Sequence, residues 1–81
     1  MKLDLYIRSW CPWCTRAIAT LDRLGYAYTV HDLELEPGAR EAMIALSGQE
    51  RVPTLRAGEH VLGDFDPEQL LAFLERHSIQ P

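Results

Sequence analysis

The sequence predicts an α/β fold with the element order β-α-β-α-β-β-α, a four-stranded mixed sheet flanked by three helices. Three observations predict it. Apolar and polar residues alternate over residues 2–8, as in a half-buried strand, and apolar residues recur at helical spacing over residues 12–24. Two further alternating segments flank Gly58-Glu59, which is typical of a β-hairpin. A β-α-β start implies two parallel strands joined by a right-handed crossover, to which the hairpin adds two antiparallel strands.

The first half of the chain supplies two strands and two helices. Residues 2–8 form the first predicted strand, and residues 12–24 form the first helix. Residues 26–32 alternate again as the second strand. Three of its residues share one face: Tyr26, Tyr28 and Val30. A short second helix follows Pro37 and ends at Gly48. Its inward side is predicted to consist of Ala39, Ala42, Met43 and Leu46.

The second half supplies the hairpin and the last helix. Residues 52–57 and 60–62 are the two predicted hairpin strands. Asp66 can cap the last helix, Pro67 suits its first position, and Gln69 stands where a capping box places its partner. The apolar side of this helix is predicted to consist of Leu70, Leu71, Phe73 and Leu74.

Composition excludes several classes of protein. We expect residues 1–81 to form one small domain, with 47% hydrophobic residues available for its core. The 12 acidic residues outnumber the 8 Lys and Arg residues, and no basic run favours nucleic acid. No stretch approaches the ~20 apolar residues of a membrane span, and the first residues lack the apolar core of a signal peptide. We therefore expect a cytoplasmic monomer that binds neither nucleic acid nor a membrane.

The cysteines carry the strongest functional signal. The chain has only 2, spaced C-x-x-C in Cys11-Pro12-Trp13-Cys14, between a predicted strand and a predicted helix. This pattern is a thioredoxin-like redox motif. C-x-x-C cysteines at helix N-termini have pKa values of ~3.5–7.5, against ~8.5 for a free cysteine, because amide N–H groups and the helix dipole stabilise a thiolate. Cys11 is therefore the predicted nucleophile, and Cys14, one turn further on, is predicted to close a disulfide with it.

A metal site is the alternative interpretation of the same cysteines. A structural zinc site needs about four ligands, and the sequence has no second C-x-x-C. Its histidines, His31, His60 and His77, lack the spacing of zinc ligands. We therefore predict neither a metal site nor a tightly bound cofactor.

Val52-Pro53-Thr54 is the second motif. By residue type alone, Pro53 is an ordinary trans-proline at the start of a strand, because only ~5–6% of X–Pro bonds in folded proteins are cis. The two motifs together, with residues 6–14, 36–48 and 52–54, resemble the glutaredoxin family over essentially the whole chain. The family's motif is usually C-P-Y-C, so Trp13 replaces a tyrosine.

The resemblance implies a thioredoxin fold and several site residues. In the family the proline is cis and faces the active-site cysteine, and the peptide before it pairs with the substrate backbone. Pro53 and Val52 are assigned these roles. Glutathione is the implied co-substrate, and Arg8 stands where the family usually has a lysine that suits its glycine carboxylate. Arg51 either meets a carboxylate too or is an exposed loop charge. Trp13 is expected to form one wall of the substrate groove, whereas Trp10 either packs inside or docks a partner.

The C-terminal segment departs from the family pattern. Glutaredoxins typically carry Gly-Gly-x-Asp-Asp, which holds the γ-glutamyl end of glutathione, but this chain has Leu62-Gly63-Asp64-Phe65-Asp66. Gly63 and Asp64 stay candidate substrate-binding residues, and Asp66 is either a ligand or a helix cap. Phe65-x-Pro67-Glu68 resembles instead the redoxins that accept electrons from thioredoxin reductase and donate them to ribonucleotide reductase.

Three functions follow from these patterns. The first is a glutaredoxin-like oxidoreductase that uses Cys11 and Cys14 to reduce disulfide-containing or glutathionylated proteins, with glutathione as reductant. The second is a redoxin reduced by thioredoxin reductase. The third is a dimeric iron–sulfur carrier, in which Cys11 and glutathione ligate a [2Fe–2S] cluster. Pro12 disfavours the third, because cluster-binding relatives usually have a small, flexible residue there.

Overall fold

The structure is a computed structural model that describes residues 2–81, and its elements follow the predicted order. They are β1 (Leu3–Ile7), α1 (Pro12–Arg23), β2 (Thr29–Asp32), α2 (Ala39–Ser47), β3 (Thr54–Ala57), β4 (His60–Gly63) and α3 (Pro67–Arg76). The strands form one sheet in the order β2-β1-β3-β4. β1 pairs in parallel with β2 and antiparallel with β3, which pairs antiparallel with β4. The predicted mixed sheet with three helices is confirmed.

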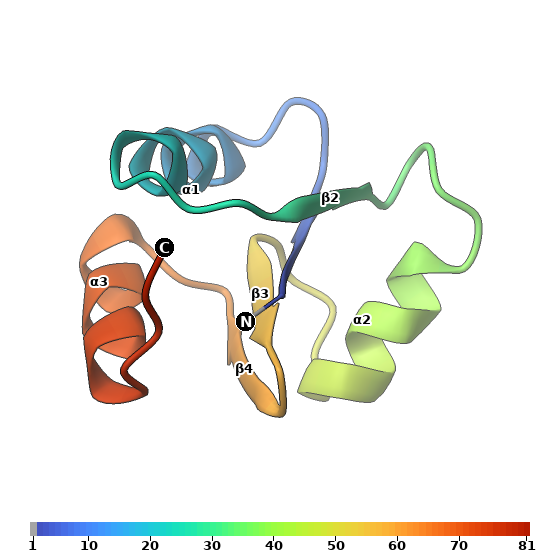
Figure 1. Ribbon diagram of the computed structural model, residues 1–81. Helices are drawn as coiled ribbons and strands as arrows, with labels where there is room; N and C mark the ends of the chain where they lie inside the picture. Colours follow the sequence, from blue (N-terminus) through green and yellow to red (C-terminus); the bar gives the residue numbers. More distant parts are fainter. Residues whose placement is uncertain (1) are drawn as a thin grey trace.

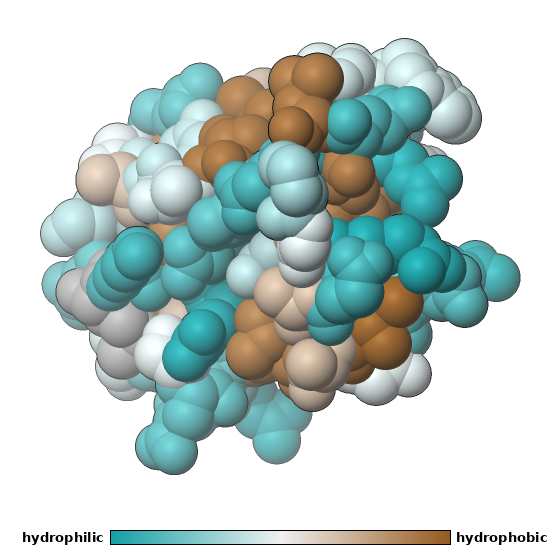
Figure 2. All heavy atoms as spheres, turned by 90° about the vertical axis from the view of Figure 1, so that its right-hand side faces the viewer, coloured by the Kyte–Doolittle hydropathy of each residue, from teal (hydrophilic) through white to brown (hydrophobic). Residues whose placement is uncertain are grey.

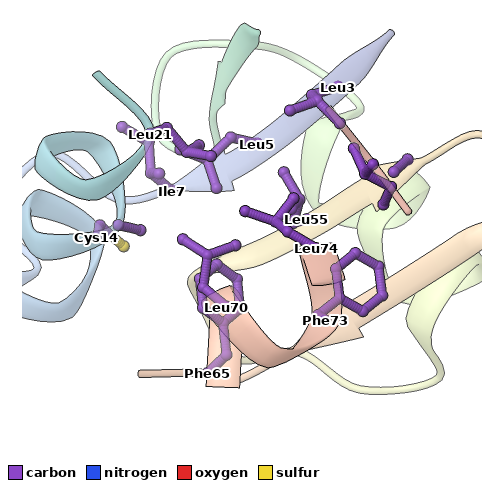
Figure 3. Close-up of a cluster of buried hydrophobic side chains, with 13 residues drawn as sticks. Leu3, Leu5, Ile7, Cys14, Leu21, Leu55, Phe65, Leu70, Phe73 and Leu74 are labelled. Carbon is purple, nitrogen blue, oxygen red and sulfur yellow. The ribbon is translucent and has the colours of Figure 1, made fainter. Parts of the chain in front are cut away.

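The helices cover both faces of the sheet, with α1 and α3 on one side and α2 on the other (Figure 1). The larger core lies under α1 and α3, where Leu5 and Leu55, opposite each other in β1 and β3, are fully buried (Figure 3). Tyr6 points to the other face and packs with Ala39 and Met43 of α2. On the side of α2, hydrophobic side chains gather in separate patches among hydrophilic ones (Figure 2). None of the helices in residues 2–81 has the length and apolar character to cross a membrane.

The second strand is shorter than predicted. β2 contains Thr29–Asp32 only, so Tyr26 and Tyr28 precede it, and Val30 is exposed because β2 is an edge strand. The Tyr26 hydroxyl donates to the Ile79 carbonyl at 2.6 Å, and the Tyr28 hydroxyl donates to Asp22 at 2.6 Å. Val30 pairs with Leu5 on the face of the larger core, and Tyr26 and Tyr28 pack against that same core, so the predicted common face is kept although only Val30 lies in the strand.

Two predicted inward residues of the helices are exposed. Leu71 is 41% exposed, and Ala42 of α2 is exposed as well. Each helix lies on the sheet along a narrow stripe, which in α2 consists of the buried Ala39 and Met43, one turn apart. The first hairpin strand also begins at Thr54, two residues later than predicted.

The capping box of α3 is present. The Asp66 carboxylate accepts the Gln69 backbone N–H at 2.8 Å, and the Gln69 side chain accepts the Asp66 backbone N–H at 2.9 Å. Pro67 occupies the first turn, where its missing N–H costs no helical hydrogen bond. Asp66 is therefore a helix cap.

A histidine bridges β1 and the segment after β2. The His31 ring is held at 2.9 Å from both Asp4 and Glu36 and stacks on Tyr6, with ring centroids 4.7 Å apart. Burial alone lowers the pKa of His31, but the hydrogen bonds to the two carboxylates outweigh it and raise the pKa above its ordinary value. A neutral ring has one N–H and can donate to only one carboxylate, so the charged ring suits this position better.

We expect His31→Gln to destabilise the protein more in acid than in alkali. Because the folded pKa is raised, the contribution of His31 is fully present below its unfolded pKa of about 6.5 and is lost as pH rises through the folded pKa. The difference in free energy of unfolding between wild type and variant should shrink on the order of 1 kcal/mol from about pH 5.5 to about pH 9. Urea unfolding at both pH values measures it.

The matched control is His77→Gln, for which the opposite slope is expected. Burial, followed by the charges of His60 and Arg76, lowers the pKa of His77. The folded state therefore binds this proton more weakly than the unfolded state, and His77→Gln should gain in relative stability as pH falls. A pH-independent effect of His31→Gln would contradict the raised pKa of His31.

Candidate active site

Cys11 lies at the start of α1. It is the N-cap residue, with φ −88° and ψ 118°, and its sulfur accepts the backbone N–H of Cys14 at 3.2 Å. Its carbonyl accepts the Thr15 N–H at 3.1 Å and so begins the helix. Pro12 occupies the first turn without losing a helical hydrogen bond. The sulfur of Cys11 therefore faces the N–H groups and the positive end of the α1 dipole.

The two cysteines differ in access. Cys11 is half-buried, whereas Cys14 is 1% exposed and belongs to the same core as Leu21 (Figure 3). Both thiols are free. Burial first, and then the hydrogen bond with Cys11, raises the pKa of the Cys14 thiol to about 12. A substrate can therefore reach Cys11, while Cys14 is a protonated thiol behind it.

Two residues that sequence reasoning missed hold the turn before Cys11. The Ser9 hydroxyl donates to the Asp32 carboxylate at the end of β2, and the same carboxylate accepts the Glu34 N–H at 2.9 Å. The hydrogen bond from Ser9 lowers the pKa of Asp32. The parallel pairing of Ile7 with Asp32 brings these segments together. Ser9 and Asp32 thus anchor the turn between β1 and α1 to the sheet.

A cleft of about 380 Å³ opens beside Cys11. It is lined by Arg8, Trp10, Cys11, Pro12, Glu50, Arg51, Val52 and Asp64. Five predicted site residues therefore meet in one place, although they come from three separate segments of the chain. Gly63 and Pro53 do not line the cleft, and Pro53 is buried.

Some charged side chains of the cleft have partners of opposite charge in the part of the chain that the structure describes, and one does not. Arg51 pairs with Asp64 at 3.5 Å, and Glu50 pairs with Arg40 at 2.6 Å. The Nε atom of Arg8 is buried and has no hydrogen-bond partner within residues 2–81. Of the two arginines that line the cleft, Arg51 has a carboxylate partner and Arg8 has none within residues 2–81.

The Val52–Pro53 peptide bond is cis. This confirms the expectation from the family resemblance, and the trans bond expected from residue type alone is wrong. The Pro53 carbonyl accepts the Asp64 N–H at 2.9 Å, which joins the start of β3 to the end of β4. No hydrogen bond of the Val52 backbone is found within residues 2–81. The backbone of Val52 can therefore pair with a molecule in the cleft.

The two tryptophans occupy different places. Trp10 is 72% exposed and lines the cleft beside Cys11, so its predicted alternative of packing inside is wrong. Trp13 is also exposed, and the Arg16 guanidinium lies 4.4 Å from the centre of its ring. It lines a second hollow of about 200 Å³ with residues of the segment 64–69, rather than the cleft itself. Asp64 contributes to both hollows.

The segment that departs from the family pattern has structural roles. Phe65 is 3% exposed and belongs to the larger core (Figure 3). Asp66 caps α3, as described above. Phe65 is therefore not free to hold a ligand, and one carboxylate oxygen of Asp66 is used by the helix cap, whereas Asp64 is exposed beside the cleft.

Comparisons with known proteins point to one protein family. The family model described as glutaredoxin matches residues 3–61. The chain is 33% identical over 66 residues to a probable glutaredoxin from Synechocystis sp., covering 80% of this chain and 75% of the relative. It is 29% identical over 80 residues to glutaredoxin 3 from Escherichia coli K12, covering 99% and 94%.

The solved structures include a similar fold. The crystal structure of a glutaredoxin from Archaeoglobus fulgidus superposes with a TM-score of 0.79 at 26% identity, covering 89% of this chain and 84% of the other. Thiol–disulfide oxidoreduction is the general activity of this family. The C-x-x-C at the start of α1, the cis-proline, the fold and the family match agree, and the chain belongs to the glutaredoxin family.

Proposed function

We propose that this protein is a dithiol oxidoreductase that reduces protein disulfides or glutathione mixed disulfides. The observation that carries the proposal is the difference between its cysteines: Cys11 is accessible at a helix N-terminus, and Cys14 is buried one turn away with its backbone N–H on the Cys11 sulfur. A nucleophile must be reachable and stabilised as a thiolate, whereas a resolving thiol is best shielded from solvent.

The reaction has two exchange steps. The Cys11 thiolate attacks one sulfur of the substrate disulfide, so a Cys11–substrate disulfide forms, the substrate S–S bond breaks, and the leaving thiolate takes the electron pair and then a proton. Cys14 next loses its proton and attacks the Cys11 sulfur, which forms the Cys11–Cys14 disulfide and releases the second substrate thiol. Two electrons have then passed from the cysteine pair to the substrate.

The first step prepares the second. The proximity of the Cys11 sulfur is, after burial, the second cause of the raised pKa of Cys14. Once Cys11 is bonded to substrate, it has no thiol proton and no charge, so this second cause of the raised pKa of Cys14 is weakened while burial stays. The mixed disulfide therefore makes deprotonation of Cys14, and with it resolution, easier.

Glutathione is the proposed reductant. One glutathione thiolate attacks the Cys11 sulfur of the Cys11–Cys14 disulfide, which forms a Cys11–glutathione disulfide and releases the Cys14 thiol. A second glutathione thiolate then attacks the glutathione sulfur of that mixed disulfide, which forms glutathione disulfide and releases Cys11. Arg8 supports this choice, because it lines the cleft beside Cys11 without a carboxylate partner in residues 2–81, and a guanidinium suits a carboxylate. Phe65 and Asp66 have structural roles where the family holds the γ-glutamyl end, so binding should be weaker than with the usual residues.

Reduction of the oxidised protein by glutathione, beside NADPH with thioredoxin reductase, tests the reductant. We expect glutathione to reduce the Cys11–Cys14 disulfide, and Arg8→Gln to slow this at least about tenfold, because a charge-assisted contact contributes about 1.5–3 kcal/mol. Stopped-flow tryptophan fluorescence follows the reaction, with Arg76→Gln as the matched control. Rapid reduction by thioredoxin reductase and none by glutathione would contradict the choice and favour a redoxin.

A further inference from the structure

The side chain of Gln49 spans the loop before the cis peptide bond. Its Oε1 atom accepts the Arg51 backbone N–H at 2.8 Å, and its Nε2 atom lies 3.3 Å from the Arg51 carbonyl. Nε2 also lies 2.9 Å from the Thr54 hydroxyl and 3.0 Å from the Ser47 hydroxyl. The Thr54 hydroxyl in turn donates to the Arg51 carbonyl at 2.8 Å. Both backbone groups of Arg51 are thus tied to one side chain.

This network ends where the cleft begins. Arg51 and Val52 line the cleft together with Cys11, and the Val52 backbone is without a hydrogen bond in residues 2–81. The peptide that joins Arg51 to Val52 begins with the carbonyl that Gln49 and Thr54 hold. The orientation of that peptide, and hence of the Val52 N–H, therefore depends on Gln49, both directly and through its contact with the Thr54 hydroxyl.

Gly63 makes room for the same side chain. It pairs with Thr54 across β3 and β4, and a Cβ atom built on it would lie 2.7 Å from Nε2 and 3.1 Å from Cδ of Gln49. The φ angle of Gly63 is not in the left-handed region, so the backbone itself does not require glycine. The three nearest atoms that a Cβ would meet all belong to Gln49. Glycine at this position therefore serves the packing of the Gln49 amide.

We propose that Gln49 is a positioning residue for peptide substrates. It fixes Arg51 so that the Val52 backbone is presented beside Cys11, and Gly63 acts through Gln49 rather than by touching substrate. The proposal rests on the proposed function, because it concerns the binding of a disulfide that carries peptide groups. A disulfide without peptide groups cannot use the Val52 backbone and should not depend on Gln49.

The test compares two disulfides in single-turnover reactions of the reduced protein. One is a glutathionylated pentapeptide, and the other is bis(2-hydroxyethyl) disulfide, which has no peptide bond. Gln49→Met keeps the length of the side chain without its hydrogen bonds, and Gln80→Met at an exposed position is the matched control. Gln49→Met should raise the half-saturating peptide concentration about three- to tenfold, which corresponds to the loss of one or two hydrogen bonds. It should leave the reduction rate of the small disulfide unchanged. The pH profile of Cys11 alkylation by iodoacetamide should also be unchanged.

Gly63 supplies a second, independent variant. Gly63→Ala should displace the Gln49 amide and reproduce the selective loss with the peptide. In a Gln49→Ala background the clashing atoms are gone, so adding Gly63→Ala should cost little more, whereas independent roles would give additive losses. Additive losses, an equal loss with both disulfides, or a Gln49→Met protein that matches wild type with the peptide would each overturn the proposal. A wild-type protein that reduced neither disulfide would instead overturn the proposed function together with it.

Discussion

Replacing Cys11 by serine is expected to abolish disulfide reduction, whereas Cys14→Ser should still complete the first exchange step. A serine hydroxyl is not a nucleophile at neutral pH, and in a Cys11→Ser protein the remaining thiol, Cys14, is buried, which by itself raises its pKa. In a Cys14→Ser protein, Cys11 keeps its place at the start of α1. Incubation with a glutathionylated peptide, followed by intact mass spectrometry, measures both results.

The two variants control for each other, because each removes one sulfur from the same helical turn. Cys14→Ser should accumulate a mixed disulfide at Cys11, and Cys11→Ser should gain no mass and show only the background rate. If Cys11→Ser reduced the peptide disulfide and Cys14→Ser did not react, Cys14 would be the nucleophile, which would contradict the assignment. The far-ultraviolet circular dichroism of both variants establishes that neither loss comes from unfolding.

Phe65→Asp is expected to destabilise the protein by more than about 4 kcal/mol. Phe65 is 3% exposed and packs in the core with Leu70 and Phe73. Removal of a buried phenylalanine costs about 3–5 kcal/mol, and burial of a carboxylate without a partner adds to that cost. Domains of this kind are stable by only about 5–15 kcal/mol, so a large part of the variant should be unfolded. Equilibrium unfolding in urea gives the number.

The control for this change is Phe65→Leu, which keeps an apolar side chain and should cost about 1–2 kcal/mol. From the sequence alone, Leu62→Gly with Phe65→Asp looks like a way to restore the γ-glutamyl site of the family. The structure shows that the second change would remove a core residue instead. A Phe65→Asp protein as stable as Phe65→Leu would contradict the position of this ring in the core.

The fold could be predicted because its signals are local. The alternation that predicts β1 and the capping residues of α3 depend on neighbours in the chain. Tyr26 and Tyr28 also alternate, but their hydroxyls bond to Ile79 and Asp22, and a periodic pattern carries no information about such partners. Which apolar residues of a helix are buried is harder to predict, since Leu71 is as apolar as its neighbours but faces solvent.

The residues of the candidate site also differ in whether the sequence predicts them. Cys11, Cys14 and Pro53 belong to short motifs whose chemistry is visible in the sequence, and Arg8 lies at a fixed spacing from them. Gln49 belongs to no such motif. A glutamine in a loop has no periodic signal, and the role of Gln49 depends on hydrogen bonds to Arg51 and contact with Gly63. Three-dimensional packing alone reveals such a residue.

The anchor of the turn before Cys11 was missed for the same reason. Ser9 and Asp32 meet through β-strand pairing across the sheet. Trp13 was placed by its position inside the C-x-x-C motif, but the direction of α1 turns its ring toward the hollow beside Phe65. Sequence spacing could not give that direction.

Alkylation of the reduced wild-type protein at about pH 6 tests most directly whether the cysteines have these separate roles. Iodoacetamide is added in limiting amount, the reaction is stopped at intervals, and the modified peptides are measured by mass spectrometry. An accessible sulfur at the N-terminus of α1 and a buried thiol behind it predict that Cys11 is alkylated while Cys14 stays unmodified. Alkylation of Cys14 as fast as Cys11, or faster, would contradict the assignment of Cys11 as the nucleophile.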